Sequence, residues 1–336
     1  DESMTGYLVR ASALEGFDEL VRHLGGDPDP LRRAQGLQTG PLAPDSWISY
    51  RAFIDLLESA AASMDCPHFG LSLSRRQDIG ILGTVGFVIR EAPDVRPALQ
   101  ELSQYLTLHN QGAEVSLMVG GDTAQLSFRV KLPGHVRVTQ QLDLVLGVGV
   151  NIMRLLCGRQ WHPLAVYLAH AEPVDRSPYR RLFDCPLHFD AEMGAFLFRA
   201  SDLQKTISSA DSDLHDLLAG HLEQIRASFP DSYPDQIRYL IRQALYTGDC
   251  SVERIASYLS VTPRTLQRRL RAEGTSYKEL LEDVRYDMAT RYLLDSNSSL
   301  TVLSSMLGYS ELSAFSNAFK LKTGLSPRNW RVRYAR

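Results

Sequence analysis

The last hundred or so residues carry one short helical pattern twice, and this repeat limits the folds open to the chain. In the first copy, apolar residues from Val252 to Leu259 recur at i, i+3, i+4 and i+7, which places them on one helical face. In the second copy, 48 positions later, Leu303 and Leu307 take the places of Ile255 and Leu259. Repeated amphipathic helices of this length predict an all-α region built from two similar units.

Each unit has a second helix with recognisable ends. Thr262 can cap the first of these helices, with Pro263 at the first helical position, and Gly274 can end it. In the second copy the corresponding cap is Ser310, and Gly324 ends the helix. A helix, a tight turn and another helix make a helix-turn-helix unit. The sequence therefore predicts two such units, at about residues 251–274 and 301–324.

The second helix of each unit has a polar face opposite its apolar one. Inward positions are expected at Leu266 and Leu270 in the first copy, and at Phe315 and Phe319 in the second. The predicted DNA-contacting positions are Arg264, Thr265, Gln267, Arg268 and Arg271, then Ser313, Ser316, Asn317 and Lys320. Arg, Gln and Asn pair with base edges in the major groove, as a recognition helix requires. A single stripe of this kind is usually a solvated surface, but its presence in both units favours double-stranded DNA.

A long helix is predicted between the two units. Ser276 can cap a helix from Tyr277 to about Asp295. Its expected buried side consists of Tyr277, Leu280, Leu281, Val284, Met288 and Tyr292. A helix over residues 277–295 spans about 28 Å, close to the roughly 34 Å between successive major-groove faces on one side of B-DNA. Such a linker helix could hold both recognition helices against one duplex.

Three segments in this region carry a family resemblance. Thr262–Gly274, Leu307–Lys320 and the closing Thr323–Pro327 resemble the two halves of the DNA-binding domain of the AraC/XylS family. The resemblance implies a transcription regulator, expected to be an activator, which binds promoter DNA and recruits RNA polymerase. Family members often have Ser-Arg where this chain has Ser316-Asn317, so weaker contacts are expected from the second recognition helix.

Charge is distributed unevenly along the chain. The residues from Asp235 to Arg336 contain 16 Lys or Arg and 10 Asp or Glu, a net charge of +6; the remainder carries −9, and the whole chain −3. A basic C-terminal part on an acidic body is typical of DNA binding through one domain. The change coincides with the Pro-, Ser- and Asp-rich segment 228–235. We expect a sensor domain at 1–230 and a DNA-binding domain at 235–336.

The sensor domain shows both helical and strand patterns. Amphipathic helices are predicted at 13–24, 50–64 and 93–109. Alternating apolar residues at 115–119 and 124–130, around Gly120-Gly121-Asp122, predict a β-hairpin. Further strands are expected at 165–169 and at either 187–189 or 195–198. The expected fold is therefore an α+β sensor domain followed by an all-α domain with two helix-turn-helix units joined by a long helix.

The sensor domain resembles that of the subgroup with the ornithine-utilisation and VirS-like regulators, rather than the cupin sensor of the arabinose regulator. The residues that carry the resemblance are Trp47–Tyr50, Phe69–Leu73, Gly80–Gly83, Tyr105–His109 and Tyr179–Phe183. It implies a sensor for a small-molecule effector, with amino acids, small organic acids and longer apolar acids as candidates, and a homodimer. Arg75, Tyr105 and His109 are the candidate effector-binding residues, although a salt bridge at a helix end for Arg75 and a structural role for His109 are common alternatives.

Other functional classes receive little support. The sequence has no P-loop, G-x-S-x-G or H-E-x-x-H motif, so no catalytic residue, metal site or cofactor is expected. Cys66-Pro67-His68 inverts the Pro-Cys-His order of alkyl-transfer DNA-repair proteins, which makes a thiol transferase a weak alternative. An architectural DNA-binding protein without a ligand would leave the N-terminal residues unexplained. The longest apolar run, 142–157, is too short and too charged to span a membrane, and a cytoplasmic protein with reduced cysteines is expected.

Overall fold

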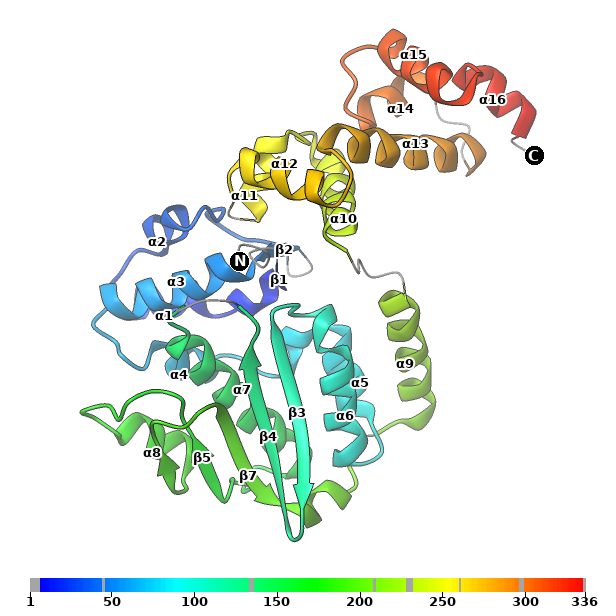
Figure 1. Ribbon diagram of the computed structural model, residues 1–336. Coiled ribbons are helices and arrows are strands. Elements are labelled where there is room, and N and C mark those ends of the chain that lie inside the picture. Colours follow the sequence, from blue (N-terminus) through cyan, green and yellow to red (C-terminus); the bar gives the residue numbers. More distant parts are fainter. Residues whose placement is uncertain are drawn as a thin grey trace. The chain divides into compact units, whose positions relative to one another are not determined.

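The computed structural model describes residues 7–43, 46–132, 136–207, 210–227, 232–259, 261–295 and 299–334. The chain forms two compact units, residues 1–229 and 230–336. The first mixes helices and strands and the second is helical (Figure 1). Of the predicted linker 228–235, residues 228–231 lie outside the described part of the chain.

The N-terminal unit is an α+β structure. Its helices are α1 (Phe17–His23), α2 (Pro28–Ala34), α3 (Tyr50–Ser63), α4 (Phe69–Ser74), α5 (Thr84–Glu91), α6 (Val95–Tyr105), α7 (Thr139–Cys157), α8 (Ser177–Phe183) and α9 (Ser212–Ala227). Short 3-10 helices are η1 (Ala11–Leu14), η2 (Ile79–Leu82), η3 (Leu106–Leu108) and η4 (Ala200–Gln204). The strands are β1 (Leu8–Arg10), β2 (Trp47–Ser49), β3 (Ala113–Gly120), β4 (Thr123–Val130), β5 (Ala165–Tyr167), β6 (Leu187–His188) and β7 (Gly194–Arg199).

The main sheet has the strand order β3-β4-β7-β5-β6. Its strands pair antiparallel except β5 and β6, which are parallel, while β1 and β2 form a separate antiparallel pair. In the predicted hairpin, Val115 lies opposite Phe128 and Leu117 opposite Leu126. Because side chains alternate along a strand, the apolar residues of β3, β4 and β7 share one face. That face packs against α7.

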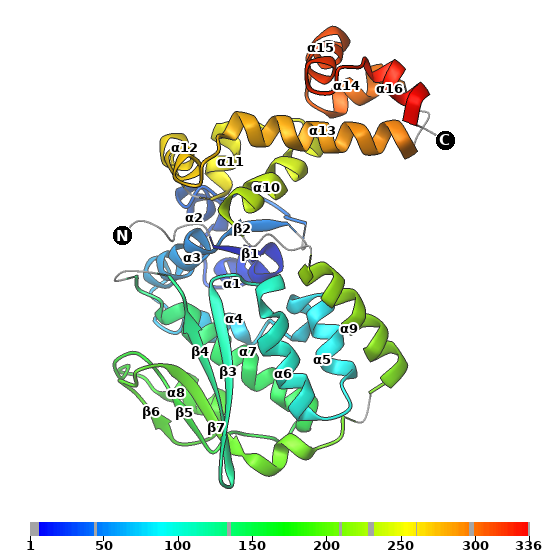
Figure 2. The ribbon, with the colours of Figure 1, turned by 45° about the vertical axis from the view of Figure 1, so that its right-hand side comes forward.

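Helix α7 passes between the sheet and α4 (Figure 2). Gly149 faces the sheet, where an added Cβ would lie 2.9 Å from the Phe128 ring and 3.0 Å from the Phe196 ring. Gly70 of α4 faces the other side of α7, where a Cβ would lie 1.9 Å from the backbone oxygen of Gln140. Glycine at these two positions therefore lets α7 approach both neighbours closely.

Two predicted helices differ from the observed ones in extent. The prediction of one helix at 13–24 was wrong at its start, because Gly16 adopts a left-handed φ of 76° between η1 and α1. The predicted helix at 93–109 divides into α6 and η3. Both alternatives for the last strand occur, as β6 and β7.

The C-terminal unit contains both predicted helix-turn-helix units and the long helix. Its helices are α10 (Tyr233–Thr247), α11 (Val252–Tyr258), α12 (Pro263–Ala272), α13 (Tyr277–Asp295), α14 (Leu300–Met306), α15 (Leu312–Thr323) and α16 (Pro327–Tyr334). Thr262 caps α12 by accepting a hydrogen bond from the backbone N–H of Thr265. Ser276 and Glu279 form a reciprocal capping box at the start of α13.

Two details of this unit correct the prediction. Ser310 is not the cap of α15, because that helix begins one residue later and Glu311 stands at its N-cap without a side-chain cap. The buried face of α13 also turns further than predicted, since Leu281 and Tyr292 are only half-buried. The fully buried residues are Tyr277, Leu280, Val284, Met288, Ala289 and Leu293. The reason is that α13 packs on both α10 and α16, so its neighbours change along its length.

Candidate DNA interface and effector cavity

The polar stripe of α12 is on the surface of the unit. Leu266 and Leu270 are fully buried, which fixes the orientation of the helix. Arg264, Gln267, Arg268 and Arg271 are exposed, and Thr265 is half-buried beside the cap. The structure thus presents three guanidinium groups and one amide together on one helical face. Their contacts with DNA stay a prediction.

Arg269 differs from the other arginines of α12 in its burial and in its neighbours. It is half-buried, and its guanidinium carbon lies 5.7 Å from the centre of the Tyr233 ring of α10. Burial raises the pKa of the Tyr233 hydroxyl, and the charge of Arg269 offsets part of this rise. Arg269 therefore holds α12 against α10 and leaves the neighbouring side chains to face outward.

The polar stripe of α15 carries fewer positive charges than that of α12. Ser313, Asn317 and Lys320 are exposed, and Ser316 is half-buried. The Ser313 hydroxyl donates to Glu311 over 3.1 Å. On its buried side, α15 carries Phe315 and Phe319, whose ring centres are 5.8 Å apart. These rings also contact Tyr309 and Trp330. The second unit therefore offers one cation and three small polar side chains where the first offers three cations.

Helix α13 is bonded to both helix-turn-helix units. At its start, the Tyr277 hydroxyl donates to the backbone oxygen of Cys250 over 2.6 Å, just before α11. In its middle, Lys322 of α15 forms an ion pair of 2.5 Å with Asp283. The Tyr286 ring lies 5.9 Å from the Phe319 ring. These contacts attach α13 to the segment before α11 and to α15.

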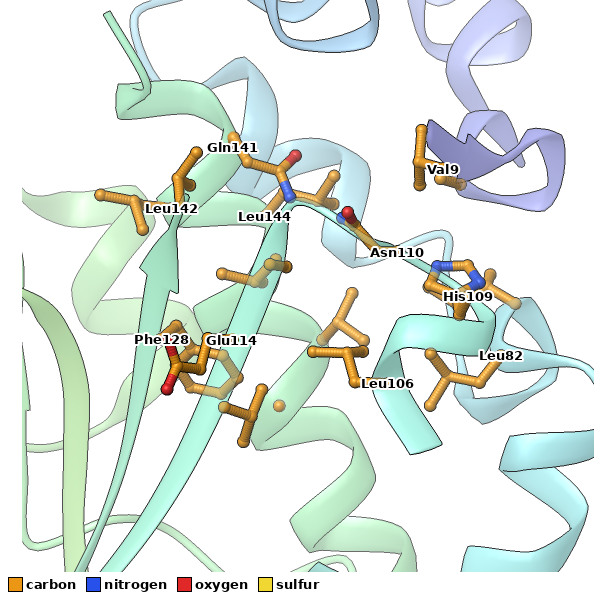
Figure 3. A pocket seen from close by; sticks show the side chains of 18 of the residues that line it. Val9, Leu82, Leu106, His109, Asn110, Glu114, Phe128, Gln141, Leu142 and Leu144 are labelled. Atoms are coloured by element: carbon orange, nitrogen blue, oxygen red, sulfur yellow. The ribbon is translucent and has the colours of Figure 1, made fainter. Parts of the chain in front are cut away.

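The N-terminal unit contains a partly open cavity of about 80 Å³ between α7, the β3–β4 hairpin, α3 and the segment after α6. Figure 3 shows Gln141 entering it from α7, with His109 and Asn110 entering from the segment that follows η3. Most of the lining is apolar and includes Leu106 and Phe128. A cavity of this size holds several water molecules, and an organic molecule of the size of benzene, which needs about 150 Å³, would require lining side chains to move.

Four buried polar atoms on the cavity lining have no hydrogen-bond partner among the described residues. They are the Tyr50 hydroxyl, Gln77 Oε1, His109 Nδ1 and Gln141 Oε1. The amides of Asn110 and Gln141 lie near the Tyr50 hydroxyl and act to lower its pKa, but neither forms a hydrogen bond of normal geometry with it. A buried polar atom without a partner costs free energy, about 1–3 kcal/mol each. This group of atoms makes the cavity a candidate ligand site.

The interior of the cavity carries no net charge. Burial raises the pKa of Tyr50 far above its ordinary value, so this residue is neutral. Burial, with the nearby charge of Arg10, lowers the pKa of His109 to about 4, so the imidazole is neutral as well. The two charged lining residues, Glu114 and Arg129, pair with each other across the hairpin over 2.5 Å, and the Arg129 side chain is exposed.

The three candidate effector residues are not brought together. His109 lines the cavity, but Arg75 is exposed at the end of α4 and is not part of its lining. Tyr105 is buried outside the lining, and its hydroxyl donates to Glu223 of α9 over 3.3 Å. Tyr50, Gln77 and Gln141 were not among the predicted effector residues, because no local pattern marks them as lining a cavity, although Gln77 lies two positions from Arg75. The signal that could have found Gln141 is its position at the start of an unusually apolar helix.

The structure also shows the surroundings of the Cys66 thiol and of possible metal ligands. Cys66 is buried, and burial raises the pKa of its thiol, whereas a nucleophilic cysteine needs a lowered one. Within the described ranges, no cluster of three or more His, Cys, Asp or Glu side chains is arranged to hold a metal ion. No helix in the described part of the chain has both the length and the apolar character to cross a membrane.

Comparison with known proteins covers both units. A family model described as the arabinose-binding domain of AraC transcription regulator, N-terminal, matches residues 25–207, and a helix-turn-helix domain model matches residues 255–333. The HTH-type transcriptional regulator VirS of Mycobacterium tuberculosis is 33% identical over 332 residues, which cover 97% of each chain. The ornithine utilization regulator of Pseudomonas aeruginosa is 23% identical over 333 residues, 98% of each chain.

A shorter match falls on another regulator. The urease operon transcriptional activator of Escherichia coli is 40% identical over 78 residues, which cover 23% of this chain and 26% of that protein. The family models and the full-length relatives agree with the observed α+β unit and the paired helix-turn-helix units. The chain therefore belongs to the AraC family, in the subgroup of VirS and the ornithine utilization regulator, and it is a DNA-binding transcription regulator.

Proposed function

We propose that this regulator is controlled by a small molecule that binds in the cavity of its N-terminal unit, and that it activates transcription. The observation that carries the proposal is the cavity itself, in which four buried polar atoms are unpartnered among the described residues. A well-formed apolar pocket with a few convergent polar groups is the usual form of a small-molecule site. An architectural DNA-binding protein would have no use for it.

The DNA side of the proposal rests on the two exposed stripes. Arg268 and Gln267 of α12 are of the residue types that pair with guanine and adenine in the major groove. Asn317 of α15 has the equivalent exposed position in the second unit. We propose that α12 makes most of the base contacts and that α15 adds a weaker set one helical turn further along the duplex.

The sign of regulation is inferred from the name of one relative. A matched relative is named as an operon activator, and its similarity falls within a 78-residue stretch. Activation of this kind requires contact with RNA polymerase near the promoter. We expect self-association through the N-terminal unit, since a dimer would place two DNA-binding units on paired DNA sites. We expect the protein to act in the cytoplasm, where the chromosome is accessible.

A binding experiment with the full chain tests this function. An operator is first selected from a pool of random duplexes, and its affinity is then measured by fluorescence anisotropy with and without a panel of metabolites. We expect affinity to fall steeply between low and physiological salt, because Lys and Arg side chains displace counterions from DNA. At least one compound should change operator affinity or raise the melting temperature. Tight operator binding that no compound alters would favour the architectural alternative.

A further inference from the structure

The amide of Gln77 has a fixed orientation. Its Nε2 donates to the backbone oxygens of Ala13 and Glu15, both over 2.9 Å. Those two carbonyl groups can only accept, so the nitrogen must face them and Oε1 must face the other way. Gln77 lines the cavity, is 4% exposed, and has no partner for Oε1 in the described structure. A residue of the cavity lining therefore carries a buried hydrogen-bond acceptor without a partner among the described residues.

The other unpartnered atoms extend this polar set. The Tyr50 hydroxyl can donate or accept, and the neutral His109 ring can do either, according to its tautomer. Gln141 adds a second amide oxygen from α7. The charged residues of the lining, Glu114 and Arg129, bind each other on the hairpin, and Arg10, whose charge reaches His109, is not part of the lining. A buried ligand charge would have no counter-charge here, and an unpaired buried charge is costly.

We propose that the cavity takes an uncharged, largely apolar molecule that carries at least one O–H or N–H donor, and that the amide oxygens of Gln77 and Gln141 receive it. This inference rests on the proposed function, since it names the chemical class of the effector. Carboxylates such as amino acids and organic acids, which the sequence suggested as candidates, lack a cationic partner in this cavity. A sugar has many hydroxyl groups but would leave most of them against apolar side chains, so arabinose is also a poor fit.

Matched probes test the class directly. Three skeletons (benzene, cyclohexane and naphthalene) are each used as a primary alcohol, a primary amide, a carboxylate and a plain methyl derivative. Binding to the full chain at pH 7.5 is measured by calorimetry and by melting temperature. For at least one skeleton, the alcohol or amide should raise the melting temperature by roughly 5–10 °C at 100 times its Kd. The carboxylate and the methyl derivative should bind about tenfold or more weakly, because one lost hydrogen bond corresponds to about tenfold.

Two variants locate the site. Val145 lines the cavity and is half-buried, so Val145→Phe should fill the space and weaken every probe. Because added bulk can cost about 1–3 kcal/mol, the melting temperature of the unliganded variant is measured beside it. Gln141→Met keeps the side-chain length and removes the acceptor, so it should weaken the alcohol and the amide about tenfold and spare the methyl derivative. Gln77 is less suited to this test, because it also holds Ala13 and Glu15.

The outcomes separate this inference from the proposed function. A carboxylate that binds as tightly as its alcohol, or a complete failure of the uncharged probes to bind, overturns the uncharged class. So does unchanged affinity in Val145→Phe, which would place the probes elsewhere. If a carboxylate binds in the cavity and alters operator affinity, small-molecule control stands although its chemical class is wrong. If the alcohol binds in the cavity and leaves operator affinity and transcription in vitro unchanged, the class stands and the control fails.

Discussion

Arg285 of α13 donates from Nε to the backbone oxygen of Leu307 over 2.8 Å, which ties the long helix to the end of α14. The same guanidinium donates from Nη2 to Gly308 over 3.0 Å and lies 4.3 Å from the centre of the Tyr309 ring. The last carbonyl groups of a helix have no partners within it, so a cation that accepts this role stabilises the helix end. One side chain thus fixes the turn of the second helix-turn-helix unit against α13.

Arg285→Ala should loosen the second unit. Loss of hydrogen bonds from a charged donor to these carbonyl groups is expected to cost about 1.5–3 kcal/mol. Chemical denaturation of the full chain measures this loss, and binding to a full operator should weaken more than binding to the half-site of α12. Arg291→Ala is the matched control, since Arg291 is exposed on the same helix and its removal changes the charge equally. Equal effects of the two variants would show that only charge matters.

Arg268→Ala should weaken operator binding by about 1–3 kcal/mol if the side chain reads a guanine. Affinity for random DNA should fall much less, so the ratio of the two affinities is the measurement. Asn317→Ala is expected to have a smaller effect on the same ratio, because the stripe of α15 has only one cation. A proportional loss on operator and random DNA would instead assign Arg268 to phosphate contact.

Gly70→Ala should destabilise the N-terminal unit strongly. The new Cβ would lie 1.9 Å from the backbone oxygen of Gln140, so α4 and α7 must move apart. Overpacking of this kind costs about 1–3 kcal/mol, or more where backbone is involved. Gly220→Ala in α9 is the control, because no heavy atom lies within 4 Å of its added Cβ. It should stabilise the chain by roughly 0.5–1 kcal/mol, as expected for a glycine in a helix interior. Thermal unfolding of both variants distinguishes close packing from a general sensitivity to alanine.

His109 should make the N-terminal unit sensitive to acid. An unfolded histidine takes up a proton near pH 6.5, whereas burial and the charge of Arg10 hold the pKa of His109 at about 4. The folded state binds fewer protons between these values, so its stability is complete above about pH 6.5 and falls as the pH drops. The total loss is roughly 3 kcal/mol. Urea denaturation at a series of pH values should show a smaller slope in His109→Gln, and parallel curves would contradict the assignment.

Much of the C-terminal unit could be predicted because its signals are local. Helical periodicity, the cap at Thr262 and the stop at Gly274 all act within a few residues, and the observed bounds of α13 match the predicted ones. The buried face of α13 could not be predicted fully. Its neighbours change from α10 to α16, so Ala289 and Leu293 are buried by contacts that arise from distant parts of the chain.

The cavity was much less visible in the sequence. Its lining is assembled from residues more than a hundred positions apart, such as Val9 and Gln141. The importance of Gln77 depends on two backbone oxygens in the segment 13–15, which no local pattern reveals. His109 was found because it follows a helical turn with Tyr105, but the structure directs the Tyr105 hydroxyl to Glu223 instead.

Helix α13 is attached to both helix-turn-helix units, and this determines which parts of the DNA-binding unit can change when operator preference changes. Tyr277 and Arg285 donate to the backbone oxygens of Cys250 and Leu307, so the attachment of α13 to both units does not depend on which side chains those positions carry. The exposed stripe of α12, in contrast, makes no contribution to the buried side of its helix. A few substitutions on the exposed face of α12, made by natural selection or by design, can therefore change which promoter is recognised. The spacing between the two recognition helices stays the same.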